Sequence, residues 1–142
     1  MEIRHLTDTY AVSPQIDPAD MAALKAAGFA TVINNRPDAE IPPELQTDAT
    51  RAAAEAAGLT YIVNPVIGGA ITLENVDRQR DAIASSSGPV LAYCASGNRS
   101  SIVWALSQAG RLSTDDLIAT PARWGYNLEP FRNSIDDLAR KG

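Results

Sequence analysis

The chain has 142 residues, of which 45% are hydrophobic and 20% are charged, and its formal net charge is −5. This composition is ordinary for a globular protein with a substantial core, and we expect residues 1–142 to form a single domain. The net negative charge disfavours nucleic acid and anionic membrane surfaces as partners.

A single cysteine, Cys94, excludes an internal disulfide and a C-x-x-C redox pair. The first residues, MEIRHLTDTY, do not resemble a signal peptide, and no segment is long and apolar enough to span a membrane. We therefore expect a cytoplasmic protein, because a reactive thiol survives in that reducing compartment. No residue pattern points to a metal site or a cofactor.

Apolar runs and amphipathic stretches alternate along the chain. Extended segments are predicted within Glu2–Val12 and at Phe29–Asn34, Leu59–Val66 and Val90–Tyr93. Helices are predicted at Asp17–Gly28, Glu44–Ala57, Thr72–Ser86, Ser100–Arg111, Ser113–Pro121 and Leu128–Arg140. This order predicts an α/β fold with a mainly parallel central sheet flanked by helices.

A polar cluster follows the segment Phe29–Asn34 and contains Arg36 and Asp38. In a parallel sheet this cluster emerges at the same edge as Cys94. Arg36 could be a second anion contact that forms a local basic pocket with Arg99, and Asp38 could orient an arginine. The alternative is a solvated turn, since Asn, Pro and Asp are common turn residues.

The clearest chemistry lies at the carboxyl end of Val90–Tyr93. Cys94 follows this segment, and the loop before the next helix consists of Ala95, Ser96, Gly97, Asn98 and Arg99. Ligands bind at this end of the strands in open α/β sheets, and the free N–H groups of such a loop can cradle a tetrahedral oxyanion. We therefore call residues Cys94–Arg99 the anion loop. Arg99 adds a two-pronged donor, and the positive end of the helix favours Cys94 as a thiolate nucleophile.

Plainer interpretations exist for each of these residues. A lone cysteine in an apolar strand is most often an inert core residue, but a bound anion would explain an arginine within a tight loop. Ser100 and Ser101 could donate to the Cys94 sulfur or satisfy backbone groups of the first helical turn. His5, the only histidine, is better explained by packing than as a catalytic base.

Two aromatic features are expected to belong to the core. Trp104 falls on the buried repeat of its helix. Trp124, Gly125 and Tyr126 form an aromatic turn that we expect to close the far side of the core.

Three stretches carry a family resemblance: VINNRPDAE at Val32–Glu40, NPVIGGAIT at Asn64–Thr72 and YCASGNRSS at Tyr93–Ser101. They resemble the phosphatase-like domains of bacterial beta-lactamase-hydrolase-like proteins, a family of which one branch is labelled sulfurtransferase. By order of elements the resemblance runs from about Ile3 to Trp124. It implies a dual-specificity (cysteine) phosphatase-like fold, an active loop at Cys94, and a persulfide dioxygenase as a fused or separate partner.

The chain departs from the cysteine phosphatases that it resembles. The loop from Cys94 to Arg99 is one residue shorter than the protein phosphatase signature and has the length seen in rhodanese-like sulfurtransferases. A phosphatase would carry its general acid in the loop that contains Gly68 and Gly69, but here Asn64–Leu73 has no carboxylate. The nearest acids, Glu74 and Asp77, lie in the first turns of a helix, where the helix dipole alone explains them.

These features predict first a sulfurtransferase that moves sulfane sulfur from thiosulfate or a persulfide, through a Cys94 persulfide, to an external thiol acceptor. The alternative is a tyrosine or dual-specificity phosphatase-like hydrolase that forms a phosphocysteine. A third possibility is a non-catalytic binder of a small oxyanion or a phosphorylated partner. The residues expected to act are Cys94, Arg99 and Ser100, with Arg36, Asp38, Gly68, Gly69 and Glu74 as accessory candidates.

Overall fold

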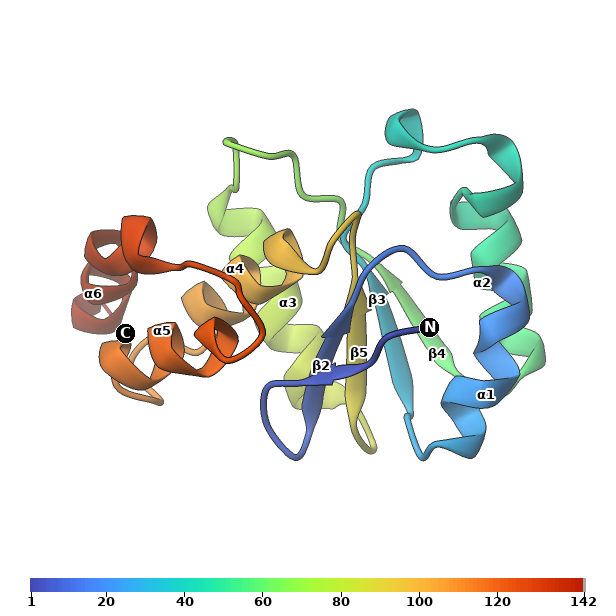
Figure 1. Cartoon of the computed structure of the whole chain (residues 1–142), viewed down its shortest axis with the longest axis horizontal. Coiled ribbons are helices and arrows are strands. Elements are labelled where there is room, and N and C mark those ends of the chain that lie inside the picture. Colours follow the sequence, from blue (N-terminus) through green and yellow to red (C-terminus); the bar gives the residue numbers. More distant parts are fainter. Residues whose placement is uncertain (142) are drawn as a thin grey trace.

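The computed structural model describes residues 1–141, which form a five-stranded sheet with helices on both faces (Figure 1). The strands are β1 (Arg4–His5), β2 (Tyr10–Ser13), β3 (Thr31–Asn34), β4 (Thr60–Val63) and β5 (Val90–Tyr93). Their spatial order is β1-β2-β5-β3-β4, and only the edge pair β1–β2 is antiparallel among them. The predicted α/β fold with a mainly parallel sheet is confirmed.

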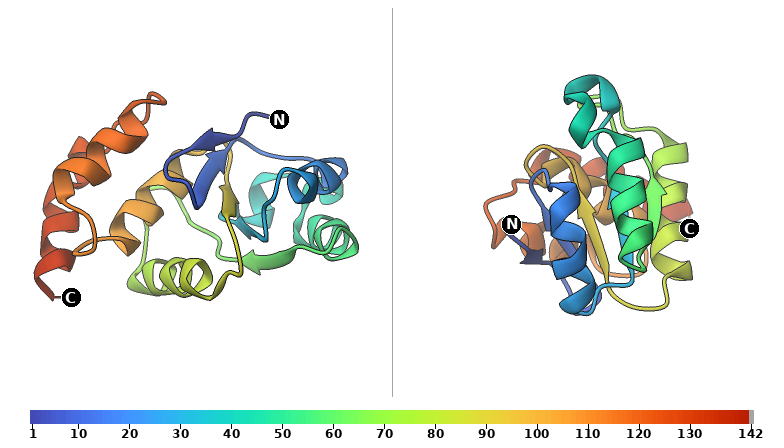
Figure 2. Two further views of the ribbon diagram at one scale, coloured as in Figure 1. Left: turned by 90° about the horizontal axis from the view of Figure 1, so that it is seen from below. Right: turned by 90° about the vertical axis from the view of Figure 1, so that its right-hand side faces the viewer.

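The helices within residues 1–141 are α1 (Met21–Ala26), α2 (Thr47–Ala56), α3 (Leu73–Ser85), α4 (Asn98–Ser107), α5 (Thr114–Ala122) and α6 (Arg132–Lys141). Figures 1 and 2 show α1 and α2 on one face of the sheet and α3 and α4 on the other, with α5 and α6 beyond α4. None of these helices combines the length and apolarity that crossing a bilayer would need.

The strand β5 is buried on both faces, as its unbroken apolar run predicts. Val90 and Ala92 pack into the core beneath α3 and α4, while Leu91 and Tyr93 pack into the core beneath α1 and α2. Trp104 lies in the first of these cores, where it stacks on Tyr10 with ring centroids 5.9 Å apart. The expected core position of Trp104 is therefore confirmed.

The register of the parallel strands brings three loops to one edge. Tyr93 pairs with Ser13 of β2 and with Asn34 of β3, so these strands end side by side. Beyond the ladder, the Asn35 N–H donates to the Tyr93 carbonyl at 2.9 Å, and the Gln15 N–H donates to the Ala95 carbonyl at 3.3 Å. The polar cluster after β3 thus emerges beside Cys94, as a parallel sheet predicts.

Several predicted boundaries differ for identifiable reasons. The helix expected from Ser100 begins at Asn98, because Gly97 adopts a positive φ of 95° and turns the chain into the helix earlier. Pro43 lies in a separate 3-10 turn, Pro43–Leu45, and α2 begins only at Thr47. Pro130 likewise confines residues 129–131 to a 3-10 turn ahead of α6.

Candidate functional site

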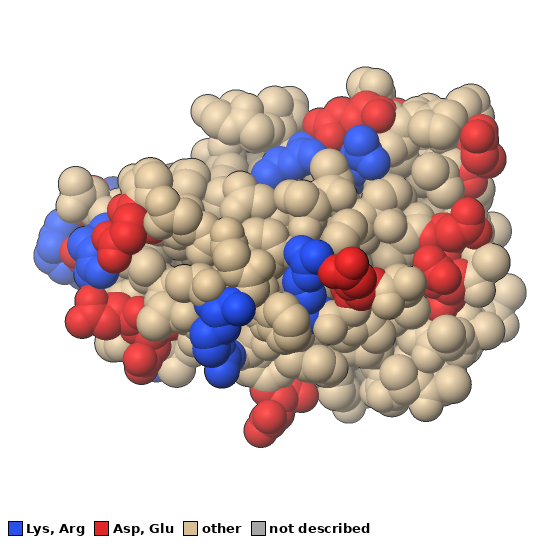
Figure 3. Space-filling model, in the orientation of Figure 1, with Lys and Arg blue, Asp and Glu red and all other residues tan. Residues whose placement is uncertain are grey.

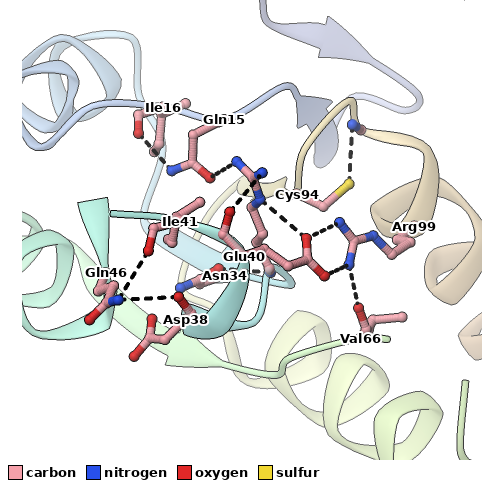
Figure 4. Close-up of polar contacts among 12 residues, drawn as sticks. Gln15, Ile16, Asn34, Asp38, Glu40, Ile41, Gln46, Val66, Cys94 and Arg99 are labelled. Atoms are coloured by element: carbon pink, nitrogen blue, oxygen red, sulfur yellow. Dashed lines mark hydrogen bonds and ion pairs between the residues drawn. The ribbon is translucent and has the colours of Figure 1, made fainter. Parts of the chain in front are cut away.

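The sulfur of Cys94 lies inside the turn between β5 and α4 (Figure 4). The residue is 1% exposed, and its Sγ accepts a hydrogen bond from the Gly97 N–H at 3.1 Å. Ala95, Ser96 and Asn98 are exposed around it, so the mouth of the loop opens to solvent. A backbone N–H aimed at the sulfur, next to the amino terminus of α4, stabilises negative charge there.

Glycine is the one residue type that this loop accepts at position 97. Its φ is 95°, in the left-handed region that favours glycine, and a Cβ there would lie 2.3 Å from the Tyr126 Oη and 3.0 Å from the Tyr126 Cζ. Any side chain at residue 97 would therefore displace both the loop and the tyrosine.

Tyr126 supports the outer side of the same loop. Its hydroxyl donates to the Ser96 carbonyl at 2.7 Å and accepts from the Arg4 Nη1 at 2.6 Å. Burial raises the pKa of Tyr126, although the nearby Arg4 opposes the shift, so the hydroxyl remains a donor at neutral pH. The expectation that the aromatic turn closes the core holds for Tyr126, which is buried in the core and also bonds the anion loop. It is wrong for Trp124, which is 45% exposed.

Arg99 lies in the first turn of α4 and reaches across the site to Glu40. Its Nη1 donates to Glu40 Oε2 and its Nη2 to Glu40 Oε1, each at 2.8 Å. Nη1 also donates to the Val66 carbonyl at 2.7 Å, which ties the guanidinium to the loop after β4. Arg99 holds the pKa of the Glu40 carboxyl below its ordinary value, because the charge-assisted hydrogen bonds favour the ionised form.

Arg36 contacts the same carboxylate from the other side (Figure 4). Its Nε lies 3.3 Å from Glu40 Oε1, and its Nη1 donates to Gln15 Oε1 at 3.1 Å. Two guanidinium groups therefore share one carboxylate, and the cluster keeps one excess positive charge. These are the two arginines that the sequence suggested for a local basic pocket, and both pair with Glu40.

Asp38 does not orient an arginine, contrary to one of the expectations for it. Its Oδ1 accepts from the backbone N–H and the hydroxyl of Thr47, both at 2.8 Å, at the start of α2. The 3-10 turn Asp38–Glu40 directs the two carboxylates to different sides, so Glu40 is the residue that meets Arg99. Glu40 lies two residues beyond the polar cluster that contains Arg36 and Asp38, at the end of the motif VINNRPDAE, and its role was missed from the sequence.

Ser100 and Ser101 do not donate to the sulfur. The Ser100 Oγ donates to Asn35 Oδ1 at 2.9 Å, and the Ser101 Oγ donates to the Gly97 carbonyl at 2.8 Å. Ser100 thus fastens the first turn of α4 to the turn after β3. It is a positioning residue in this structure and does not touch the nucleophile.

A buried polar network continues from Ser100 into the molecule. The Tyr10 hydroxyl donates to the Ser100 carbonyl at 2.9 Å, and Gln79 of α3 donates to that hydroxyl at 3.0 Å. Asn35 donates to Gln79 Oε1 at 3.0 Å. These bonds connect β2, α3, α4 and the turn after β3 beneath the anion loop and rigidify it, since buried polar groups are costly to leave unpaired.

Glu74 lies outside this arrangement. It is exposed and pairs with Arg78 one helical turn away, at 2.7 Å. His5 stacks on Phe29 with centroids 6.1 Å apart, in agreement with a packing role. Tyr93, which precedes the cysteine, donates or accepts a hydrogen bond with the Tyr61 hydroxyl at 2.8 Å and belongs to the core.

Gly68 and Gly69 line a cavity of about 530 Å³ together with Asn98 and Arg99 of the anion loop. A Cβ at either glycine would meet nothing within 4 Å, so this side of the cavity is open. On the face shown in Figure 3, much of the surface is uncharged, and basic side chains lie beside acidic ones above the upper end of the sheet. The site is thus an anion loop with a largely uncharged hollow next to it.

Sequence comparison matches residues 2–111 to the family described as "Beta-lactamase hydrolase-like protein, phosphatase-like domain". The beta-lactamase hydrolase-like protein of Xylella fastidiosa (strain Temecula1) is 36% identical over 130 residues, which are 90% of this chain and 30% of the relative. That of Agrobacterium fabrum (strain C58) is 35% identical over 122 residues, 84% of this chain and 28% of the relative. The chain therefore spans less than a third of these curated relatives.

Solved structures extend the likeness to the whole fold. A candidate phosphatase from Neisseria meningitidis Z2491 is 33% identical, with a TM-score of 0.82 over 97% of this chain and 99% of that one. TpbA of P. aeruginosa, solved with phosphotyrosine, is 17% identical, with a TM-score of 0.70 over 98% of this chain and 88% of that one. The fold predicted from the resemblance is confirmed, and the chain belongs to the phosphatase-like domain family of beta-lactamase hydrolase-like proteins, which is related to the cysteine phosphatases.

Proposed function

We propose that this chain is a cysteine-dependent phosphomonoester hydrolase in which Cys94 is the nucleophile. The observation that carries the proposal is the Gly97 N–H directed at the Cys94 sulfur at 3.1 Å, within a loop that ends in Arg99. This arrangement places the sulfur beside backbone N–H groups and a guanidinium that can bind an oxyanion. The family description and the phosphatase fold support the same chemistry.

In the first step the Cys94 thiolate attacks the phosphorus, and the bond from phosphorus to the leaving oxygen breaks. The leaving group departs with the electron pair, and the phosphoryl group stays on sulfur as a phosphocysteine. The loop N–H groups and Arg99 bind the non-bridging oxygens as their charge grows. Water then attacks the phosphorus, the P–S bond breaks, both protons of the water leave with the phosphate, and the thiolate is restored.

The structure provides little help for a poor leaving group. Asn64–Leu73 carries no carboxylate, and the Glu40 carboxyl, paired with Arg99, has a pKa below its ordinary value and is a weak proton donor at neutral pH. General acids accelerate such steps by roughly 10²–10⁴. We therefore infer that the substrates are aryl phosphates or similar esters whose leaving groups need no protonation.

A leaving-group series tests this function. The value of kcat/KM is measured for aryl phosphates whose phenols span several pKa units, in the wild type and in Cys94→Ser. We expect a steep fall as the phenol becomes more basic, and loss of turnover in Cys94→Ser with folding unchanged. Full activity of Cys94→Ser would exclude the proposal.

Sulfur transfer is the second candidate, because the short loop and the missing general acid suit a leaving group that is already an anion. The Cys94 thiolate would attack the outer sulfur of thiosulfate, the S–S bond would break, and sulfite would leave with the electron pair. The resulting persulfide would pass its sulfur to an external thiol. A Cys94 persulfide detected by mass spectrometry after incubation with thiosulfate supports this candidate, and its absence under turnover excludes it.

A further inference from the structure

A largely apolar groove starts at the anion loop and runs along α4. Its volume is about 530 Å³, within the range of roughly 300–1,000 Å³ of small-molecule sites. Asn98 and Arg99 form one end, and apolar side chains that include Ile71, Val76, Ile102 and Phe131 line its length. These residues come from the loop before α3, from α3, from α4 and from the turn before α6.

One residue, Arg99, is shared by the groove and the anion loop, and this determines which ligand the groove can bind. Arg99 belongs both to the groove and to the cluster that we assign to oxyanion binding. A molecule that fills the loop and the groove together must therefore join an oxyanion to an apolar body. The apolar side chains give that body a favourable transfer from water.

The charged residues that line the groove limit the ligand further. Asp137 of α6 lines it, and the Asp137 carboxylate is paired with Arg140 of the same helix. Arg99 is the only Lys or Arg among the described residues that line the groove. A second anionic group beside α6 would find a carboxylate and no further Lys or Arg in the described lining, so the groove favours a body that carries no further negative charge.

The geometry points to the apolar substituent of the substrate itself as the occupant of this groove. The substrate class is then a phosphomonoester of a hydrophobic phenol with an uncharged body. This inference rests on the proposed hydrolase function and narrows its substrate.

The test compares phenyl, 4-butylphenyl and 4-hexylphenyl phosphate, each below its micelle concentration. The alkyl chain barely changes the pKa of the phenol, so chemistry at phosphorus stays constant along the series. Each buried methylene should raise kcat/KM by roughly two- to fourfold, so the hexyl compound should gain on the order of tenfold or more even if only about half of its chain is buried. Equal kcat/KM values for the three esters, with measurable turnover of phenyl phosphate, would overturn the proposed role of the groove. The proposed hydrolase function would be unaffected by that result.

A matched pair of variants tests whether the gain from the alkyl chain arises in this groove. Leu73 is 66% exposed and lines the groove, whereas Ile67 is 61% exposed and does not. Leu73→Ser should lower the gain from the hexyl chain by roughly threefold or more, while Ile67→Ser should keep it. Equal effects of the two substitutions would contradict the assignment.

A binding measurement separates this inference from the catalytic proposal. Hexylphosphonate and methylphosphonate are titrated into Cys94→Ser by calorimetry, which needs no turnover. Tighter binding of hexylphosphonate by on the order of tenfold, reduced in Cys94→Ser/Leu73→Ser, supports the groove even if no ester is hydrolysed. Equal affinities for the two phosphonates would overturn it.

Discussion

Arg99 holds the Glu40 carboxylate with both of its Nη nitrogens, each at 2.8 Å, although the two residues lie 59 positions apart in the chain. Glu40 follows β3 and Arg99 lies in the first turn of α4, so the pair connects the two loops that the sheet register brings together. Such a bidentate pair fixes the plane of the guanidinium. We infer that Glu40 is the positioning residue for Arg99.

Replacing Glu40 with glutamine tests this role. The amide keeps the shape of the side chain but loses the charge, so Arg99 loses its fixed orientation. We expect KM for an aryl phosphate to rise by about tenfold, equivalent to about 1.4 kcal/mol, with a smaller change in kcat. Asp38→Asn is the matched control, because Asp38 bonds Thr47 and does not contact Arg99. Similar kinetics for the two variants would show that Glu40 does not position Arg99.

The same pair predicts a pH dependence. Hydrogen bonding to Arg99 is the largest cause of the lowered Glu40 pKa, so the carboxylate remains paired somewhat below its ordinary value of 4.5. A group with a lowered folded pKa contributes fully above its ordinary value, and the contribution disappears as pH falls through the lowered one. The ratio of the wild-type to the Glu40→Gln affinity for sulfate should be constant from neutral pH to about pH 5. It should approach one only as pH falls below the ordinary value of 4.5. Equal affinities of the wild type and Glu40→Gln for sulfate already at neutral pH would contradict the role of this pair.

Gly97→Ala should damage the anion loop selectively. The new Cβ would lie 2.3 Å from the Tyr126 Oη at a positive φ, so the loop must shift away from Cys94. We expect kcat/KM to fall by on the order of 10² or more, because oxyanion donors act only when correctly placed. Adding Tyr126→Phe removes the closest clash and should recover part of the loss. Wild-type kinetics in Gly97→Ala would mean that the loop tolerates displacement.

Ser100→Ala should affect stability more than catalysis. The Ser100 hydroxyl bonds Asn35 Oδ1 in a buried network and does not touch the sulfur. Its removal should lower the free energy of unfolding by about 1–3 kcal/mol, with a loss of kcat/KM below about tenfold. Denaturant unfolding and steady-state kinetics measure the two effects. A loss of activity as large as that of Cys94→Ser, at unchanged stability, would restore the catalytic role first expected for this residue.

The central part of the site could be predicted from local sequence. A strand buried on both faces, one cysteine, a glycine and an arginine within six residues specify a strand, an anion loop and a helix amino terminus. The parallel sheet followed from the alternation of elements. Arg36 was then placed correctly beside Arg99, because parallel strands end at one edge.

The supporting residues could not be predicted in the same way. Whether Asp38 or Glu40 meets Arg99 depends on the 3-10 turn at Asp38–Glu40, which redirects both side chains. Tyr126 reaches the loop from beyond α5, and no local pattern indicates that contact. Ser100 follows Arg99 directly, but the buried amide of Asn35 provides a better partner for its hydroxyl than the sulfur does.

The most direct measurement is mass spectrometry of the acid-quenched enzyme during turnover of an aryl phosphate. The account predicts one phosphoryl group on the peptide that contains Cys94, formed within the first turnover and absent from Cys94→Ser. Phosphate release by Cys94→Ser at the wild-type rate, or turnover of the wild type with no phosphorylated Cys94 at any time, would contradict it.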